Sequence, residues 1–538
     1  MSPDIAYSTL TPLLVVFGAA ILGVLVEAFA PARHRYRAQL VLYLGGLAAA
    51  LVSVVWLAGT QVVTAEGAVA VDGPALFLQG LIAVVALGSG LLISERTTVS
   101  AGSRVKVLAG FAPQAAGTPG GDAEREAERA GAMQTEVFPL ALFATGGLML
   151  FPASHDLITL FIALEVLSLP LYVMCGMARR RRLLSQEAAV KYFLLGAFSS
   201  AFFAYGAALI YGYAGTVDFT GIAAVVEAEG GNALAVTGVA MMSVGLLFKV
   251  GAVPFHTWTP DVYQGAPIAI TAFMAAGTKV AAFGAIMRFF HTAVPGLETD
   301  WSPVLWVIAA LTMVVGTVVA VTQNDIIRLL AYSSVAHAGF LLTGVLGPES
   351  LGMPAVLFYL AAYAVSTVGV FAAAGLVRDP DGAGITDLRA WSGLGRRQPL
   401  IAGAFALLLL ALAGIPLTSG FIAKFAVFSA AVAGGAFVLV VIGVLTSAIA
   451  AAFYVRVIVV MFFRESPADS DPGPAADAGS GADVRADTRE DSVAVAFAQR
   501  PVTLVVVGVA AVVTVVLGIA PQPLLDLADS ASVFALGF

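Results

Sequence analysis

Two lysines lie near the middle of apolar segments that are long enough to cross a membrane. The segments are residues 233–256 and 267–291, and the lysines are Lys249 and Lys279. A lysine at that depth costs roughly 2.5–3.5 kcal/mol even on a lenient insertion scale, so it indicates a functional site that supplies a partner. Gly251 and Pro254 follow Lys249 closely and predict an interruption of its helix. A buried cation beside a broken helix is typical of ion-translocating membrane proteins.

Three more titratable side chains lie within other apolar segments: Glu165, His337 and Lys424. We expect Glu165 to pair with Lys249, because two opposite charges that meet can both stay ionised away from water. His337 has hydroxyl neighbours, and Lys424 follows a second Gly-Pro interruption at 414–416. Together with Lys249 and Lys279, these residues could form a polar axis along the membrane plane.

His337 and three further residues allow more than one interpretation. His337 and His256 could each relay protons or could be ordinary hydrogen-bonded packing residues. Lys191 lies four residues after Glu187, so a local ion pair explains it about as well as a functional role does. Arg288 lies near the end of a span, where a long side chain usually reaches out to the interface.

The composition identifies an integral membrane protein. The chain has 538 residues, of which 59% are hydrophobic and 11% charged, whereas a soluble domain has about 25% charged residues. The net charge of −7 and the absence of basic clusters with aromatics argue against nucleic-acid binding. A single cysteine, Cys175, permits no internal disulfide and no cysteine metal site. We expect no cofactor, because no cysteine cluster, haem-spaced histidine pair or nucleotide loop is present.

The apolar runs predict an all-α protein with fourteen transmembrane helices. Residues 10–30 are interpreted as a retained first span, since no basic region precedes them. The predicted spans are 10–31, 38–59, 74–94, 135–152, 156–178, 187–212, 233–256, 267–291, 302–322, 325–346, 354–377, 400–430, 435–463 and 499–521.

The cations predict the orientation of these spans. If both termini lie outside, all but six of the 27 Lys and Arg residues fall in the inside loops and none in the outside loops. The six that lie within spans are Lys191, Lys249, Lys279, Arg288, Lys424 and Arg456. The long loops 95–134 and 464–498 are then cytoplasmic, and their Gly, Ala and Pro content predicts flexibility.

Two stretches of the chain share an order of motifs. His155-Asp156-Leu-Ile resembles Asn324-Asp325-Ile-Ile, and a Gly-Pro interruption follows each one: Pro254 lies 98 residues after Asp156, and Pro416 lies 91 residues after Asp325. The matched spans are five apart, so the second copy must run the opposite way through the membrane. We therefore expect two inverted five-helix repeats, each with a broken helix. The expected regions are 1–134, 135–291, 302–463, a flexible acidic loop at 464–498, and a last span with its tail at 499–538.

Three sequence elements resemble those of a known family. They are Lys249-Val-Gly-Ala-Val-Pro-Phe-His-Thr-Trp-Thr-Pro-Asp-Val-Tyr-Gln-Gly-Ala-Pro267, Ala-Leu-Glu165-Val-Leu-Ser-Leu, and Gly-Phe-Ile-Ala-Lys424-Phe. They are similar to the subunit N family, one of the antiporter-like, proton-translocating subunit families of bacterial NADH–quinone oxidoreductase (respiratory complex I). The likeness covers about residues 135–465. A lysine at 424, where subunit M would have glutamate, favours N, and so does a chain end too short for the lateral helix of subunit L.

The resemblance implies roles for these residues. Glu165 and Lys249 would act as a coupled pair, Lys279 as a central relay and Lys424 as the far-side proton carrier, and Lys191 matches a further lysine of the family. It also implies a bacterial cell membrane and, as neighbours, subunit M and the small subunits K and J. NAD, FMN, iron–sulfur clusters and quinone would be bound by partner subunits. A subunit of a multi-subunit Na⁺/H⁺ antiporter and a non-pumping scaffold of the membrane arm remain alternatives, and a solute transporter fits less well.

The orientation can be tested by one-sided labelling. Cysteines are introduced at Ser2 and at Ser470 in a chain that lacks Cys175, and intact cells are treated with a membrane-impermeant maleimide. Because the two positions are predicted to lie on opposite sides, Ser2→Cys should be labelled and Ser470→Cys should not. Equal labelling at both positions would contradict the fourteen-span arrangement.

Overall fold

The computed structural model describes most of the chain. The described residues are 6–101, 104–109, 111–112, 121–122, 126, 134–179, 181–379, 384–465, 496–497 and 500–535. The predicted loops at 95–134 and 464–498 lie largely outside these residues. The first-half helices are α1 (Thr11–Phe29), α2 (Ala32–Trp56), α3 (Gly73–Ser94), α5 (Val137–Leu150), α6 (Leu157–Cys175), α7 (Arg182–Ala214), α8 (Phe219–Glu229), α9 (Ala233–Val250), α10 (Trp258–Gly265) and α11 (Ile268–Arg288).

The second-half helices follow in the same manner. They are α12 (Glu298–Thr322), α13 (Ile326–Val345), α14 (Glu349–Ala374), α15 (Leu394–Arg397), α16 (Pro399–Ala413), α17 (Ser419–Ala433), α18 (Phe437–Phe463), α19 (Pro501–Ile519) and α20 (Gln522–Ser530). Short turns of tighter or wider helix are η1 (Phe151–Ala153), η2 (Phe289–Ala293), η3 (Pro295–Leu297) and η4 (Leu388–Trp391).

The described strands form three small antiparallel pairs. They are β1 (Val62–Thr64) with β2 (Val69–Val71), β3 (Arg96–Ala101) with β4 (Arg104–Ala109), and β5 (Val377–Arg378) with β6 (Ala496–Phe497). Within the described residues, twelve helices are long and apolar enough to cross a membrane, and three further apolar helices are shorter. The prediction of an all-helical membrane protein is confirmed at this level.

Three helices form the centre of the bundle. Nearly every residue of α11, α13 and α14 is buried, whereas α7, α12, α18 and α19 present apolar side chains on the surface, among them Phe198, Val304 and Val444. Apolar side chains on an outer face are stable only against lipid or another protein. The polar side chains of the central helices are therefore kept away from the hydrocarbon.

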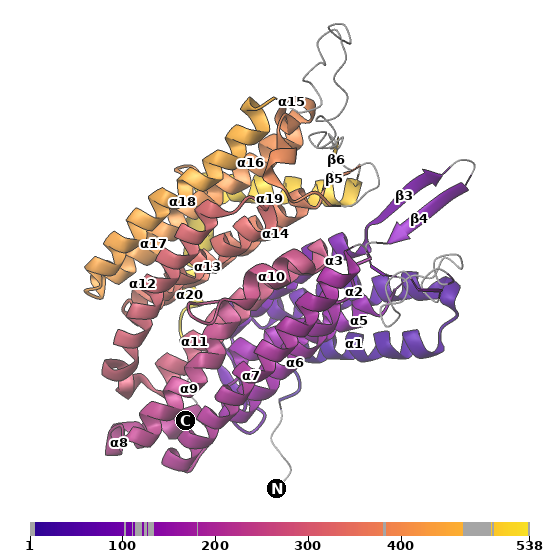
Figure 1. Ribbon diagram of the computed structural model, residues 1–538. Helices are drawn as coiled ribbons and strands as arrows, with labels where there is room; N and C mark the ends of the chain where they lie inside the picture. Colours follow the sequence, from indigo (N-terminus) through magenta and orange to yellow (C-terminus); the bar gives the residue numbers. More distant parts are fainter. Residues whose placement is uncertain are drawn as a thin grey trace, which may run out of the picture.

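The loops gather at two opposite ends of the helices. Figure 1 shows the β3–β4 hairpin and the β5–β6 pair at one end and α8 at the other. The described parts of both chain ends meet the turn around β1–β2: the amide of Ala6 donates to Thr64 Oγ1 at 3.3 Å, and the amide of Ala535 donates to Asp72 Oδ2 at 3.0 Å. Both chain ends therefore lie at the same end of the bundle.

Two helices end where glycine and proline predicted an interruption. α9 ends at Val250 because Gly251 takes a left-handed conformation with φ +72°, and α10 begins only at Trp258. α16 ends at Ala413, where Gly414 has φ +82°, and α17 begins at Ser419. The last carbonyls of α9 and α16 therefore lie inside the protein without a hydrogen-bond partner in their own helix.

The position predicted for Arg288 is wrong. Its side chain does not reach an interface but is 1% exposed, and its Nη2 lies 2.7 Å from Oδ1 of the fully buried Asp72. Its Nε also donates to the carbonyl of Pro152 at 2.6 Å. Asp72 is the N-cap of α3, so this ion pair ties α3 to α11 and to the C-terminal segment. Arg456, in contrast, donates to the carbonyls of Val321 and Gln323 at the end of α12.

Breaking the Arg288–Asp72 pair should destabilise the protein strongly. Arg288→Met leaves a buried carboxylate without its cation, which costs about 3–5 kcal/mol. We expect a clearly lower melting temperature in detergent, and the double variant with Asp72→Asn should lose less than the sum of the single losses. Arg456→Met, which removes hydrogen bonds but no ion pair, serves as the control. A wild-type melting temperature for Arg288→Met would contradict the assignment.

Candidate functional site

Lys249 is buried among hydroxyl groups and aromatic rings. It lies in the last turn of α9 and is 1% exposed. Its Nζ donates to Ser168 Oγ at 2.7 Å and to Tyr172 OH at 3.4 Å, both on α6. The ring centroids of Tyr172, Tyr192 and Phe248 lie 5.4–5.6 Å from Nζ. Cation–π attraction and the partial negative charge of a helix C-terminus both stabilise an ammonium group there.

Glu165 lies on the same helix as Ser168, but the direct ion pair predicted with Lys249 is not formed. Within the described chain, Glu165 Oε1 is buried without a hydrogen-bond partner, and the nearest acceptors of Lys249 are the hydroxyls of Ser168 and Tyr172. Ser168 lies three residues after Glu165, one turn along α6. Ser168 and Tyr172 therefore connect Lys249 to the helix that carries Glu165.

Lys279 binds the end of the helix that carries Lys249. It lies in the middle of α11 and is 2% exposed. Its Nζ donates to the carbonyl of Val250 at 2.6 Å, which is the last residue of α9. Because α9 ends at Val250, this carbonyl has no partner in its own helix, and the C-terminus of α9 supplies the acceptor that Lys279 needs.

Lys424 has the same arrangement at the second interruption. It lies on α17, and its Nζ donates to the carbonyl of Ala413, the last residue of α16, and to Ser447 Oγ, both at 2.8 Å. The ring of Phe340 lies 4.7 Å from Nζ. A Cβ at Gly414 would come within 2.8 Å of the Lys424 side chain, so glycine is needed there for the approach as well as for its φ of +82°.

His337 lies in the buried middle of α13. Its Nδ1 shares a hydrogen bond of 2.8 Å with Tyr359 OH, and the ring of Tyr363 lies 5.1 Å away. Tyr363 OH is in turn 2.8 Å from Ser334 Oγ. The ring of Phe340 lies 5.8 Å from that of His337 and also 4.7 Å from Lys424 Nζ. The histidine is therefore surrounded by hydroxyl groups and shares the neighbour Phe340 with Lys424.

Lys191 and His256 lie apart from this buried row. Lys191 forms the predicted pair with Glu187 at 2.7 Å, and a second one with Asp261 at 2.8 Å. His256 is half-buried in the segment between α9 and α10, and its ring faces that of Tyr332 at 6.3 Å. Within the described residues, neither side chain is hydrogen-bonded to Lys249 or Lys279.

Asp261 was not predicted as a site residue. It lies on α10 and accepts from Lys191 and, at 2.7 Å, from Arg328 Nη1. Burial alone would raise the pKa of Asp261, but its hydrogen bonds and charge interactions with the two cations outweigh burial and hold the pKa below its usual value. The sequence offered one signal, an acid within the polar segment between two spans. Ser168, Tyr172, Tyr359 and Ser447 were missed because hydroxyl residues are common in spans and give no signal alone.

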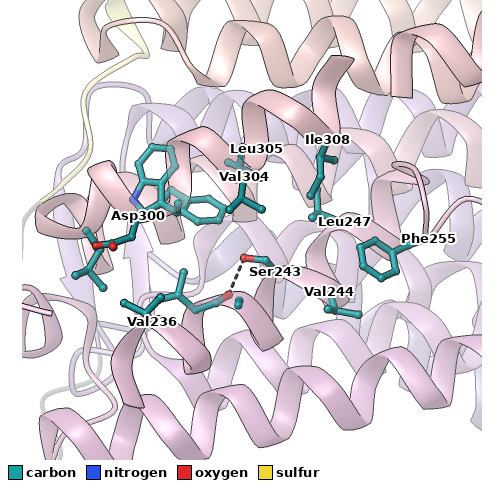
Figure 2. Close-up of a pocket in the computed structure, with 14 residues that line it drawn as sticks. Val236, Ser243, Val244, Leu247, Phe255, Asp300, Val304, Leu305 and Ile308 are labelled. Carbon is teal, nitrogen blue, oxygen red and sulfur yellow. Dashed lines mark hydrogen bonds between the residues drawn. The ribbon is translucent and has the colours of Figure 1, made fainter. Parts of the chain in front are cut away.

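A separate apolar groove lies between α9 and α12. Its volume is about 180 Å³, and Figure 2 shows it lined by Leu247, Phe255 and Val304, with Asp300 near one end. The hydroxyl of Ser243 donates to its own helix at Val239. None of the buried titratable residues Lys249, Lys279 and Lys424 lines this groove, so it lies apart from the polar row. Within the described residues, no group of His, Cys, Asp and Glu side chains could hold a metal ion.

The chain is similar to several known proteins. The family model "NADH:quinone oxidoreductase/Mrp antiporter, TM" matches residues 154–450. NADH-quinone oxidoreductase subunit N of Rhodococcus opacus (strain B4) is 58% identical over 547 residues, covering 99% of this chain and 97% of that protein. A chain of respiratory complex I from Thermus thermophilus with bound aureothin is 31% identical with a TM-score of 0.73, covering 96% of this chain and 99% of that one.

A chain of the Mrp complex from Dietzia sp. DQ12-45-1b is also similar in structure. Its TM-score is 0.76, and the match covers 98% of this chain and 97% of that one. The sequence identity is 24%, so this likeness shows a shared fold alone.

The contact between Lys249 and Ser168 can be tested by removing one hydroxyl. Ser168→Ala should destabilise the protein by about 1.5–3 kcal/mol, the usual contribution of a hydrogen bond to a charged group. Ser243→Ala is a matched control, because its hydroxyl bonds only to its own helix. Melting temperatures in detergent would measure both. Equal losses in the two variants would mean that the Lys249 contact contributes nothing.

Proposed function

Since this chain belongs to the NADH-quinone oxidoreductase subunit N family of proton-translocating complex I subunits, we propose that protons pass along its buried polar row. The row consists of Glu165, Lys249, Lys279, His337 and Lys424. One observation carries the proposal: Lys279 and Lys424 each donate to the last carbonyl of an interrupted helix. These lysines donate hydrogen bonds to neutral acceptors and contact no carboxylate, so each can hold a proton or release it.

Each member of the row has its own role in this proposal. Glu165 controls the charge on Lys249 from a distance, with Ser168 between them as the hydrogen-bond partner of the lysine. Lys279 passes the proton on, and His337 links Lys279 to Lys424 through its hydroxyl surroundings. Lys424 is the far-side carrier. Lys191 and His256 are proposed as secondary members that supply protons to the row.

We further propose that the row spans two inverted repeats of five helices. Two isolated antiparallel β-bridges support the repeat: the backbone of Asp156 pairs with that of Asp218, and the backbone of Asp325 pairs with that of Asp387. Asp156 caps α6 and Asp325 caps α13, and the partner lies 62 residues further on in both cases. Corresponding backbone hydrogen bonds flank the bridges: the amide of Leu157 donates to the carbonyl of Val217, and the amide of Ile326 donates to that of Thr386.

The proposed regions and orientation follow from the same elements. If α16 and α17 form one interrupted span and α5 forms another, the apolar helices make fourteen spans, with repeats at 135–291 and 302–463. The regions 1–134, 464–498 and 499–538 then flank the repeats. The contacts of Ala6 and Ala535 at one end of the bundle support termini on the same side, which we propose to be the outside of the bacterial cell membrane. The loops 95–134 and 464–498 would then be cytoplasmic.

The driving reaction is proposed to lie in other subunits. We propose that subunits M, K and J are neighbours of this chain, and that NAD, FMN, iron–sulfur clusters and quinone are bound elsewhere in the complex. The identity of 58% to a subunit N relative over nearly the whole chain favours this assignment over an Na⁺/H⁺ antiporter subunit. A scaffold without relay function would not need buried lysines that cost several kcal/mol each.

Lys424 offers the sharpest test of proton transfer. Arginine keeps its proton at every physiological pH, whereas a buried lysine can lose it. We expect Lys424→Arg to assemble into the complex but to translocate fewer protons per electron and to slow quinone reduction, because the steps are coupled. Proton uptake by membrane vesicles during NADH oxidation measures the ratio. Lys424→His should restore part of the activity, because histidine titrates near pH 7.

A second lysine serves for comparison in the same assay. Lys249→Met should impair translocation as well, whereas Lys→Arg changes outside the spans, such as Lys106→Arg, should not. If Lys424→Arg kept the wild-type proton-to-electron ratio, Lys424 would be a structural counter-charge, and the scaffold interpretation would gain support.

A further inference from the structure

Asp261 connects the two halves of the protein on the short helix α10. α10 packs against both α7 of the first half and α13 of the second. Oδ2 of Asp261 accepts from Lys191 Nζ on α7 at 2.8 Å, and Oδ1 accepts from Arg328 Nη1 on α13 at 2.7 Å. One carboxylate thus binds one cation from each half.

A second residue of α10 strengthens the link to α13. Gln264 lies three residues after Asp261, on the same helix face. Its Oε1 accepts from Arg328 Nη1 at 3.2 Å, and its Nε2 donates to Asp325 Oδ2 at 2.7 Å. Asp325 also caps α13. Side chains of α10 therefore bind both the N-cap and the first turn of α13.

The beginning of α10 touches the surroundings of Lys249. The indole of Trp258 donates to the carbonyl of Phe248 at 3.0 Å and stacks on Tyr192 with ring centroids 4.7 Å apart. Tyr192 and Phe248 are two of the three rings around Lys249 Nζ. Tyr192 also follows Lys191 directly in the chain. A shift of α10 would therefore move the rings that surround Lys249.

The charges explain why one acid matters more than its neighbours. The side chains of Lys191, Asp261 and Arg328 are 43%, 34% and 29% exposed, and partly exposed ion pairs are weak and can open. Without Asp261, the like charges of Lys191 and Arg328 would lose the carboxylate that both of them bind. Loss of Glu187 removes only an outer partner of Lys191 and leaves the bridge intact.

We propose that Asp261 is a positioning residue whose carboxylate holds α10 between the two halves and thereby keeps the aromatic surroundings of Lys249 in place for proton transfer. This inference rests on the proposed function of Lys249. Asp261 itself transfers no proton in this role. It links the arrangement of the second half, through Arg328, to the first interrupted helix.

The test uses the intact complex in membrane vesicles. Asp261→Asn keeps the size of the side chain and removes its charge, and proton translocation should fall about fivefold, in keeping with the loss of two partly exposed ion pairs. Asp261→Glu should restore most of the rate because it keeps the charge. Glu187→Gln is the matched control and should behave as wild type. The pH profile of the residual rate in Asp261→Asn should keep its wild-type shape.

Several outcomes would overturn the inference. A wild-type rate in Asp261→Asn, or equal impairment in Asp261→Glu, would remove the positioning role. A shifted pH profile would make Asp261 a proton-transferring group. Lys249→Met separates the two levels of the proposal: normal translocation in that variant refutes the proposed function, whereas impairment there with a normal Asp261→Asn refutes only the role of Asp261.

Discussion

The rest of this structure depends on the hydrogen-bond acceptors that its buried lysines need. An ammonium group away from water needs hydrogen-bond acceptors, and the surrounding helices have used their own carbonyls internally. The interruptions after Val250 and Ala413 free one carbonyl each, and Lys279 and Lys424 occupy them. The left-handed glycines Gly251 and Gly414 are the local cause of both interruptions. A backbone conformation at two positions thus makes two charged sites possible.

We propose that the kind of partner separates relay cations from structural ones. Arg288 is paired with the buried carboxylate of Asp72, and arginine does not release its proton, so that pair is a fixed link between α3 and α11. Lys249, Lys279 and Lys424 donate instead to hydroxyls and carbonyls, which are neutral. A lysine that loses its proton there leaves no directly bonded carboxylate behind. The same bundle therefore holds both kinds of cation.

The sequence predicted the buried lysines and the helix ends before Gly251 and Gly414 because both depend on local signals. A charge within an apolar run and a glycine close to a proline can be read over a few residues. The partners could not be read in this way. Asp72 lies 216 residues before Arg288, and Ser168 rather than Glu165 accepts the hydrogen bond from Lys249, because the side of α6 that faces α9 is decided by packing. Asp261 was missed for the same reason.

The first interruption is held by contacts from several directions at once. The amide of Val253 donates to Thr312 Oγ1 on α12 at 3.0 Å, Lys279 binds the carbonyl of Val250, and Arg328 binds α10 through Asp261. Thr312 and Arg328 belong to the second half of the chain. A small displacement of one half against the other would therefore change the anchoring on both sides of the interruption together. Lys249 lies in the last turn of α9, and Lys279 binds the carbonyl of Val250, so such a displacement would change the surroundings of both lysines.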